Sequence, residues 1–466
     1  MTAIELADAY RSRELSPVDA TQALLNRIEA LDPAVNAFCH VDVGETVAQA
    51  RAAESRHAAG EPRGPLDGVP IAVKDVFNTR GWPTLKGSRL VDLHQDWSDD
   101  APAVARLREA GAVLIGKTTT PEFGWKGTTD NSLTGITRNP WDLTKTPGGS
   151  SGGSAAALAA GLAPLALGTD GGGSIRIPGA FTGLVGLKPT FGRVPSAPMS
   201  PFGTLSHVGP MARTVADAEL LFATLAVYDS QDWTGLPTTP TEPVRDVDVA
   251  GLRVMFSLTM GYAEVDPQVA SHVTAAVEVL ESLGMEVVVG DPGIDDPTPI
   301  WETLWYGGAA ALVDGLDKAR LGGVDPGLIE IAIAGNRLSA LEYVKAAGQR
   351  VDLAVALGKV LSEYDLLVTP TMPIAAFDAG VEVPPDWPHK RWQTWSPFSL
   401  PFNLSQQPAA TVPCGLTRAG LPVGLQIVAG KHRDDLVWRV ARAYEAARSN
   451  GDDIFTRPVE EIRQPG

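Results

Sequence analysis

Apolar and polar positions along the first part of the chain predict helices and strands in alternation. Ser16-Pro17-Val18-Asp19 combines a serine cap, a proline in the first turn and a carboxylate three positions after the serine, a pattern typical of a helix start. Amphipathic stretches predict helices over residues 20–31 and 45–59. The apolar run at residues 68–73 predicts a short strand that ends at Lys74.

The same alternation continues as far as residue 226. We predict a helix near residues 102–110 and a strand over 112–115. A helix-like alanine run passes into an apolar, strand-like segment over 155–167. Thr214 is placed to cap a further helix over 215–226.

The second half begins after a connection rich in Pro, Thr and Asp at residues 229–248, which indicates a surface segment. Residues 299–359 are predicted to be mostly helical. Predicted strands and a closing helix complete the chain, at residues 252–256, 285–289, 366–370, 410–413, 426–428 and 434–448. Strands that alternate with helices favour an α/β fold, in which a large mixed β-sheet is covered by helices on both faces.

The chain is long enough for one large or two ordinary domains, and we predict a single domain over residues 1–466. Its parts would be a core at about 60–228, a more variable substrate-side portion at about 249–405, and closing strands and a helix at about 406–450. No internal repeat is visible.

Composition and charge narrow the classes of function. The 44% apolar and 20% charged residues are ordinary for a globular protein. A net charge of −17, from 38 basic and 55 acidic residues, argues against nucleic acid as the main partner. The N-terminus lacks the pattern of a secretory signal, and the longest apolar run is too short to span a bilayer. We therefore expect a cytoplasmic enzyme with no membrane or nucleic-acid partner.

Two glycine-rich turns carry the candidate nucleophiles. Ser150 and Ser151 lie among the glycines of residues 148–153, and Ser174 directly follows Gly171 to Gly173. A flexible linker is the ordinary alternative for such composition, but the flanking sequence is apolar and belongs in a core. Residues 148–152 also fit the G-x-S-x-G elbow of α/β-hydrolases, yet the two prolines within residues 139–147 make a poor preceding strand.

The second turn suits the stabilisation of negative charge. After Ser174 we expect the first turn of a short helix that stops at Pro178. Its free N–H groups would then face the atom that Ser174 attacks. We therefore take the main-chain N–H groups of Gly171, Gly172, Gly173 and Ser174 as candidate donors of an oxyanion hole.

A serine nucleophile needs a base, and the histidines do not provide an obvious one. The seven histidines are scattered, and none lies in a stretch that resembles a site. Lys74 is the alternative, because a lysine at the end of an apolar strand can be buried and neutral. The competing interpretation, at even odds if the segment stood alone, is a lysine paired with Asp75 or capping the strand end.

Taken together, these segments resemble the amidase signature family. The resemblance covers most of the chain in order, and it rests on VPIAVKD at 69–75, TPGGSSGGSA at 146–155, GTDGGGSIR at 168–176, GLKPT at 186–190, HVGPMARTV at 207–215 and LPVGLQIV at 421–428. It implies the amidase signature fold and a Ser–Ser–Lys triad without metal or cofactor. Ser174 would be the nucleophile, and Ser150, on a cis peptide bond after Gly149, would pass the proton toward neutral Lys74.

Three further residues of the motifs are expected to support the site. Asp170 and Arg176 should pair across the turn, since a carboxylate and a guanidinium in apolar sequence need partners. Ser151 would form hydrogen bonds within the first turn. The sequence also departs from the family at Gly171, where many members carry Thr or Ile, which leaves the size of the substrate open.

The implied activity is hydrolysis of a carboxylic amide through an acyl-enzyme. We prefer neutral aryl or alkyl amides, because no lone Arg or Asp stands out as a substrate anchor; carbamates (a urethanase activity) and small esters could share the chemistry. Candidate pocket walls are aromatic, and the tryptophan-rich loop at 383–401 could be a lid or an anchored segment: Phe123, Trp125, Trp305, Trp392 and Trp395.

Two other functions remain open at this stage. One is the A-type subunit of a tRNA-dependent amidotransferase, which resembles this family and releases ammonia from glutamine for a partner. The other is a non-catalytic binding protein on the same scaffold, which the intact Lys74, Ser150 and Ser174 disfavour. The natural substrate and the oligomeric state, a homodimer included, are not readable from the sequence.

Overall fold

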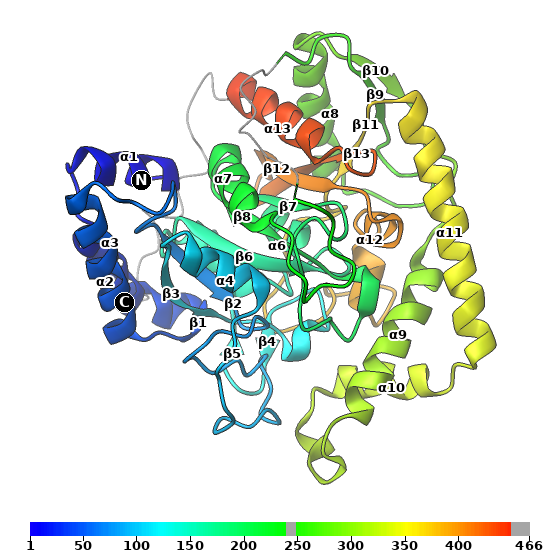
Figure 1. Cartoon of the computed structure of the whole chain (residues 1–466). Helices are drawn as coiled ribbons and strands as arrows, with labels where there is room; N and C mark the ends of the chain where they lie inside the picture. Colours follow the sequence, from blue (N-terminus) through cyan, green and yellow to red (C-terminus); the bar gives the residue numbers. More distant parts are fainter. Residues whose placement is uncertain (239–247, 449–466) are drawn as a thin grey trace.

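The computed structural model describes residues 1–238 and 248–448, and its centre is one twisted sheet (Figure 1). The strand order is β1-β3-β2-β6-β8-β7-β12-β13-β11-β9-β10. β2 is parallel to β3 and β6, and β9 is parallel to β10 and β11, whereas the pairs from β6 to β11 through the middle of the sheet are antiparallel. The predicted mixed sheet of an α/β fold is therefore confirmed.

The strands of this sheet are β1 Phe38–His40, β2 Pro70–Lys74, β3 Val113–Thr118, β6 Leu165–Asp170, β7 Val185–Lys188, β8 His207–Ala212, β9 Arg253–Phe256, β10 Glu286–Val289, β11 Leu366–Pro370, β12 Ala409–Leu416 and β13 Pro422–Ala429. A separate two-stranded ribbon consists of β4 Asp130–Asn131 and β5 Gly135–Ile136.

The α-helices are α1 Ala3–Ser12, α2 Pro17–Val35, α3 Val43–Ala59, α4 Pro102–Glu109, α5 Gly152–Ala159, α6 Arg176–Thr182, α7 Val215–Leu225, α8 Pro267–Ser282, α9 Thr298–Asp314, α10 Pro326–Asn336, α11 Ala340–Glu363, α12 Leu400–Ser405 and α13 Asp434–Arg448. Short 3-10 turns lie at η1 Glu122–Gly124, η2 Gly203–Leu205, η3 Lys318–Gly323 and η4 Trp392–Trp395.

Local sequence explains where several of these helices begin. The Ser16 hydroxyl accepts a hydrogen bond from the Val18 N–H at the start of α2. Thr214 accepts one from the Asp217 N–H at the start of α7, as its position predicts. The short helix after Ser174 differs from the prediction, because α6 continues through Pro178 to Thr182. Pro178 lies in the first turn, where a helix does not need the missing N–H.

Alternate residues of the strands enter two different cores. Val73 of β2 and Leu167 of β6 pack in the core that also contains apolar residues of α1, α4, α7, α8 and α13. Ala72 and Ala166, their neighbours along the chain, pack instead against α2 and α5. Because side chains of a strand alternate between faces, the sheet has helices on both of them.

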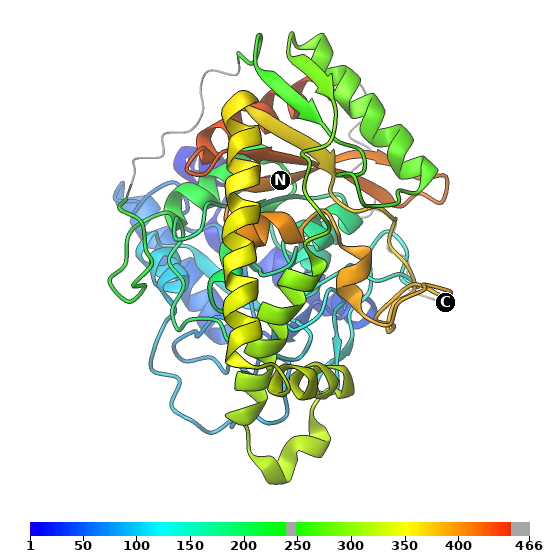
Figure 2. The same ribbon diagram turned by 90° about the vertical axis from the view of Figure 1, so that its right-hand side faces the viewer.

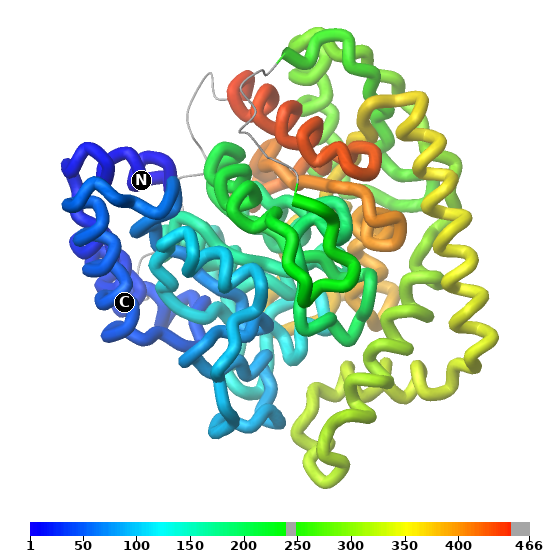
Figure 3. Tube along the Cα trace, viewed as in Figure 1, coloured from blue at the N-terminus to red at the C-terminus, as the bar shows by residue number. Residues whose placement is uncertain are grey.

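The helices of the second half form an outer layer. Figure 2 shows α11 crossing the molecule as one long helix, with α9 beside it and α10 at its lower end. In Figure 3 the N-terminal helices lie on the side of the molecule opposite to α9, α10 and α11. The predicted mostly helical segment at 299–359 corresponds to this layer. The predicted surface connection at 229–248 lies in part outside the described residues.

Candidate active site

The two glycine-rich turns and the end of β2 meet at one place in the sheet. Lys74 is the last residue of β2, Ser150 precedes α5, and Ser174 lies between β6 and α6. β2 and β6 are adjacent parallel strands, so the turns that follow them leave the same edge. The Ser151 N–H donates to the Ser174 carbonyl at 3.2 Å and ties the two turns together.

Lys74 lies within hydrogen-bond distance of three hydroxyl oxygens. Its Nζ donates to Ser150 Oγ at 2.7 Å, Ser151 Oγ at 3.0 Å and Thr169 Oγ1 at 2.8 Å. The side chain is fully buried. Burial lowers the pKa of Lys74 well below its ordinary value, although the negative charge of Asp170 acts in the opposite direction. A neutral amine in this position can accept a proton through Ser150.

The first turn has the backbone that the resemblance implies. The peptide bond between Gly149 and Ser150 is cis. Gly149 is also packed too closely for a side chain, because a Cβ there would lie 2.5 Å from the Thr128 carbonyl oxygen. Ser151 closes the turn against β6, as its Oγ donates to the Thr169 carbonyl at 3.2 Å and accepts from the Thr169 N–H at 3.2 Å.

The second turn presents three of the four N–H groups that the sequence suggested. The Gly173 N–H donates to the Asp170 carboxylate at 2.8 Å, so it is occupied and cannot serve as a free oxyanion donor. Among the described residues, none accepts a hydrogen bond from the N–H groups of Gly171, Gly172 or Ser174. These three groups remain as candidate donors.

Residues from the second half of the chain hold the carbonyl groups of this turn. Trp301 Nε1 donates to the Gly171 carbonyl at 3.0 Å, and the Ser399 hydroxyl donates to the Gly172 carbonyl at 2.6 Å. In a planar trans peptide the C=O and N–H bonds point in opposite directions. The Trp301 hydrogen bond therefore directs the Gly172 N–H away from the indole ring.

A buried ion pair supports the turn from behind. Arg176 donates to both carboxylate oxygens of Asp170 at 2.9 and 2.8 Å, and both side chains are fully buried. Arg176 also donates to Asn403 at 2.7 Å and Gln426 at 2.9 Å. Despite its burial, which acts in the opposite direction, the charge and hydrogen bonds of Arg176 hold the pKa of Asp170 well below its ordinary value.

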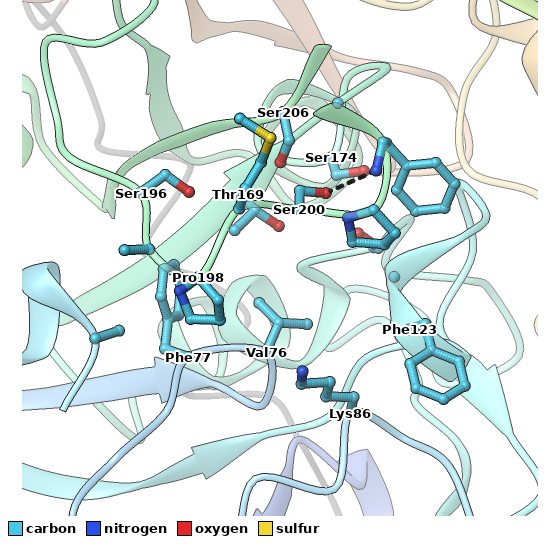
Figure 4. Close-up of a pocket in the computed structure, with 18 of the residues that line it drawn as sticks. Val76, Phe77, Lys86, Phe123, Thr169, Ser174, Ser196, Pro198, Ser200 and Ser206 are labelled. Atoms are coloured by element: carbon cyan, nitrogen blue, oxygen red, sulfur yellow. Dashed lines mark hydrogen bonds between the residues drawn. The ribbon is translucent and has the colours of Figure 1, made fainter. Parts of the chain in front are cut away.

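Ser150 and Ser174 border a cavity of about 260 Å³ (Figure 4). Its walls come from three places, namely the segment after β2, the turn at η1 and the loop at residues 195–202. Phe123 and Trp305, two of the five predicted wall residues, line this cavity. The predominance of apolar side chains makes it suited to an apolar substrate group.

The other three predicted wall residues lie elsewhere. Trp125, Trp392 and Trp395 are buried and do not line the cavity. Trp392 packs edge-to-face against Trp301 with ring centroids 5.2 Å apart, behind the glycine turn. The predicted wall role of these three side chains therefore needs correction. The described contacts favour an anchored segment over a lid for Trp392 and Trp395.

Several residues that border or support the site carried little signal in the sequence. Thr169 directly precedes the recognised Asp170 motif and contacts Lys74. The loop at 195–202 showed only turn signals, and Trp301 looked like any apolar residue of a helix. Lys86 also lines the cavity, and its signal was a lone basic residue shortly after the Lys74 strand.

Two searches of the described residues bear on other kinds of site. Within residues 1–238 and 248–448, no group of three or more His, Cys, Asp or Glu side chains is placed to hold a metal ion. In the same ranges, no helix is both long and apolar enough to cross a membrane.

A mixed α/β sheet that places a buried lysine beside two serines at an apolar cavity defines a hydrolase of the serine class. The Amidase family model matches residues 19–438, and the chain belongs to this amidase signature family. It is accordingly an amide-hydrolysing enzyme that acts on C–N bonds.

Relatives with different activities resemble the chain to a similar degree. An acylamidase of Rhodococcus erythropolis is 38% identical, covering 97% of this chain and 96% of the relative. The A-type subunit of the glutamyl-tRNA(Gln) amidotransferase of Acidothermus cellulolyticus is 40% identical, covering 96% and 94%. The crystal structure of a bacterial aryl acylamidase superposes with a TM-score of 0.91 at 29% identity, covering 99% of this chain and 98% of the other.

Proposed function

We propose that this protein is a stand-alone amidase that hydrolyses a carboxylic amide through an acyl-enzyme on Ser174. The observation that carries the proposal is the 2.7 Å hydrogen bond between the fully buried Lys74 Nζ and Ser150 Oγ, at the cavity that Ser174 borders. A serine hydroxyl is a weak nucleophile unless an adjacent base takes its proton. Lys74, kept neutral by burial, is that base.

The proposed reaction has two halves. Ser174 Oγ attacks the amide carbonyl while its proton moves to Ser150, whose own proton moves to Lys74. The C–N bond then breaks, the relay returns a proton to the leaving nitrogen, and an amine or ammonia departs. Water attacks the resulting ester by the same relay, which releases the acid and restores Ser174.

The oxyanion of each tetrahedral intermediate needs donors that are already in place. The unoccupied N–H groups of Gly171, Gly172 and Ser174 fit this requirement, and the Trp301 and Ser399 hydrogen bonds keep the turn in one conformation. The ion pair of Asp170 and Arg176 supports the same turn, and Ser151 connects it to the first one.

The apolar cavity favours aryl or alkyl groups on the substrate. Carbamates and small esters are further candidates, because their cleavage would pass through the same kind of acyl-enzyme. The similarity to an acylamidase and to an aryl acylamidase structure supports this preference.

A second candidate is the A-type amidotransferase subunit, which the 40% identity to such a subunit favours. Release of ammonia from glutamine for a partner would use the same Ser174 chemistry. The acidic net charge of −17 speaks against a direct contact of this chain with tRNA.

One substrate panel tests both candidates. The purified chain and its Ser174→Ala variant are assayed with an anilide, a primary aliphatic amide, a urethane, an ester and glutamine. Release of amine from the anilide or the urethane, lost in Ser174→Ala and resistant to a chelator, supports the stand-alone amidase. Hydrolysis of glutamine alone, or co-purification of a second subunit with no hydrolysis by the isolated chain, supports the amidotransferase role. Activity that survives Ser174→Ala, or that a chelator abolishes, refutes the mechanism.

A further inference from the structure

Among the described residues that line the active-site cavity, Lys86 alone has a charged side chain. In Figure 4 it is drawn on the side of the cavity away from Ser174, with its ammonium nitrogen directed toward Val76. The other lining residues are apolar side chains, hydroxyl-bearing side chains or glycines. A single cation therefore faces an otherwise uncharged space that leads to the nucleophile.

The backbone around Lys86 is held firmly. The Lys86 carbonyl accepts a hydrogen bond from the Phe123 N–H at 2.7 Å, which joins two cavity-lining residues. Both of these residues have a positive φ, 54° for Lys86 and 53° for Phe123. Non-glycine residues seldom adopt this conformation, and such residues cluster at functional sites.

The ammonium of Lys86 has no counter-ion in the described part of the chain. Within those residues its Nζ forms no ion pair and donates no hydrogen bond. The carboxylate that influences it most is Asp75, but Asp75 is paired with the buried Lys117 at 3.1 Å. The three groups together carry one uncompensated positive charge. On its other side Lys86 borders a smaller hollow that includes Asp96 and Asp99, and neither of them forms an ion pair with it.

An unpaired cation in a partly dry cavity is costly unless a ligand completes it. Burial lowers the pKa of Lys86, while Asp75 raises it and Lys117 lowers it. A bound anion would favour the charged ammonium, and its three N–H donors suit a carboxylate.

We propose that Lys86 is a substrate anchor and that the preferred substrates are amides carrying a carboxylate, with the carboxylate on Lys86 while the amide carbonyl lies at Ser174. This inference rests on the proposed amidase function and narrows its substrate class. It replaces the preference for uncharged amides, which depended on the absence of an obvious anchor in the sequence. The apolar walls between Lys86 and Ser174 would hold the aryl or alkyl part that joins the two groups.

Matched pairs of substrates test the anchor on the full chain. 4-Acetamidobenzoate and 4′-methylacetanilide differ by a carboxylate on the amine side, and succinanilate and valeranilide differ by one on the acyl side. We expect the carboxylate member to have the higher kcat/KM in at least one pair. Lys86→Met should lower that ratio about 10- to 100-fold, as expected for loss of a charge-assisted hydrogen bond.

Two variants separate the anchor from general effects of charge. Lys86→Arg keeps the positive charge and should retain most of the preference. Lys345→Met removes one positive charge from an exposed position on α11 and should leave the ratio unchanged. A ratio in Lys86→Met equal to that of the parent chain, or a preference for the neutral member in both pairs, would overturn the anchor.

A binding measurement keeps this test independent of turnover. Titration calorimetry compares succinanilate and 4-acetamidobenzoate on Ser174→Ala and on Ser174→Ala combined with Lys86→Met. Tighter binding that requires Lys86 supports the anchor, and equal binding to both proteins refutes it. Absence of hydrolysis of every amide by the parent chain, with binding intact, would contradict the proposed amidase and not the anchor.

Discussion

Replacement of Trp301 by Phe tests whether the second half of the chain positions the oxyanion donors. The change keeps an aromatic ring next to Trp305, whose ring centroid lies 4.5 Å away, but it removes the Nε1–H that donates to the Gly171 carbonyl at 3.0 Å. Trp301 is fully buried, so no water replaces the donor in the present arrangement. The Gly171 carbonyl is then left without this partner.

The size of the effect follows from that lost hydrogen bond. A buried carbonyl without a partner costs about 1–3 kcal/mol. If the turn relieves this cost by rotating the peptide, the Gly172 N–H turns with it and leaves its place. A loss of that size in transition-state stabilisation corresponds to a decrease in kcat of about 5- to 150-fold. KM should change little, because the donor acts on charge that develops during the reaction.

The assay measures kcat and KM on the best amide of the panel, beside a thermal unfolding curve. Trp438→Phe is the matched control, because Trp438 is also buried and its indole N–H has no partner among the described residues. It lies on α13, in the core on the helical face that contains α7. If Trp301→Phe loses no more kcat than Trp438→Phe, or if only KM rises, the positioning argument is wrong.

Two other predictions concern the relay and its support. Because neutral Lys74 is the base, kcat/KM should fall as the pH drops through the lowered pKa of Lys74, and Lys74→Met should abolish turnover without preventing folding; a pH–rate profile without such a limb would contradict the role. Arg176→Met leaves the Asp170 carboxylate buried and unpaired, so chemical denaturation should show a loss of about 3–5 kcal/mol, and an unchanged midpoint would refute the bracing role.

The sequence predicted the parts of the site that depend on neighbours along the chain. Lys74, Ser150 and Ser174 each lie in a short segment whose apolar flanks and glycines define its own conformation. The pairing of Asp170 with Arg176 spans only six residues, and the structure shows it. The mixed sheet was accessible for the same reason, since strand and helix periodicity is local.

Features that depend on distant segments could not be predicted in this way. Gly173 was taken as an oxyanion donor because nothing in the sequence shows that its N–H is used by Asp170. Trp392 and Trp395 have the composition of pocket walls, yet they fill the space behind the turn. Whether Lys86 faces solvent or a cavity is decided by Phe123 and by the loop at 195–202, which come together only in the folded chain.

This division explains why sequence identity leaves the substrate open. The reacting groups come from residues 74–174, whereas the contacts that hold the glycine turn come from Trp301, Ser399 and Asn403. The cavity is bordered by yet other residues, Lys86 and the loop at 195–202 among them. An acylamidase and an amidotransferase subunit can therefore be 38% and 40% identical to this chain while they act on different amides. Residues facing the cavity, and not the shared motifs, must decide which amide this enzyme cleaves.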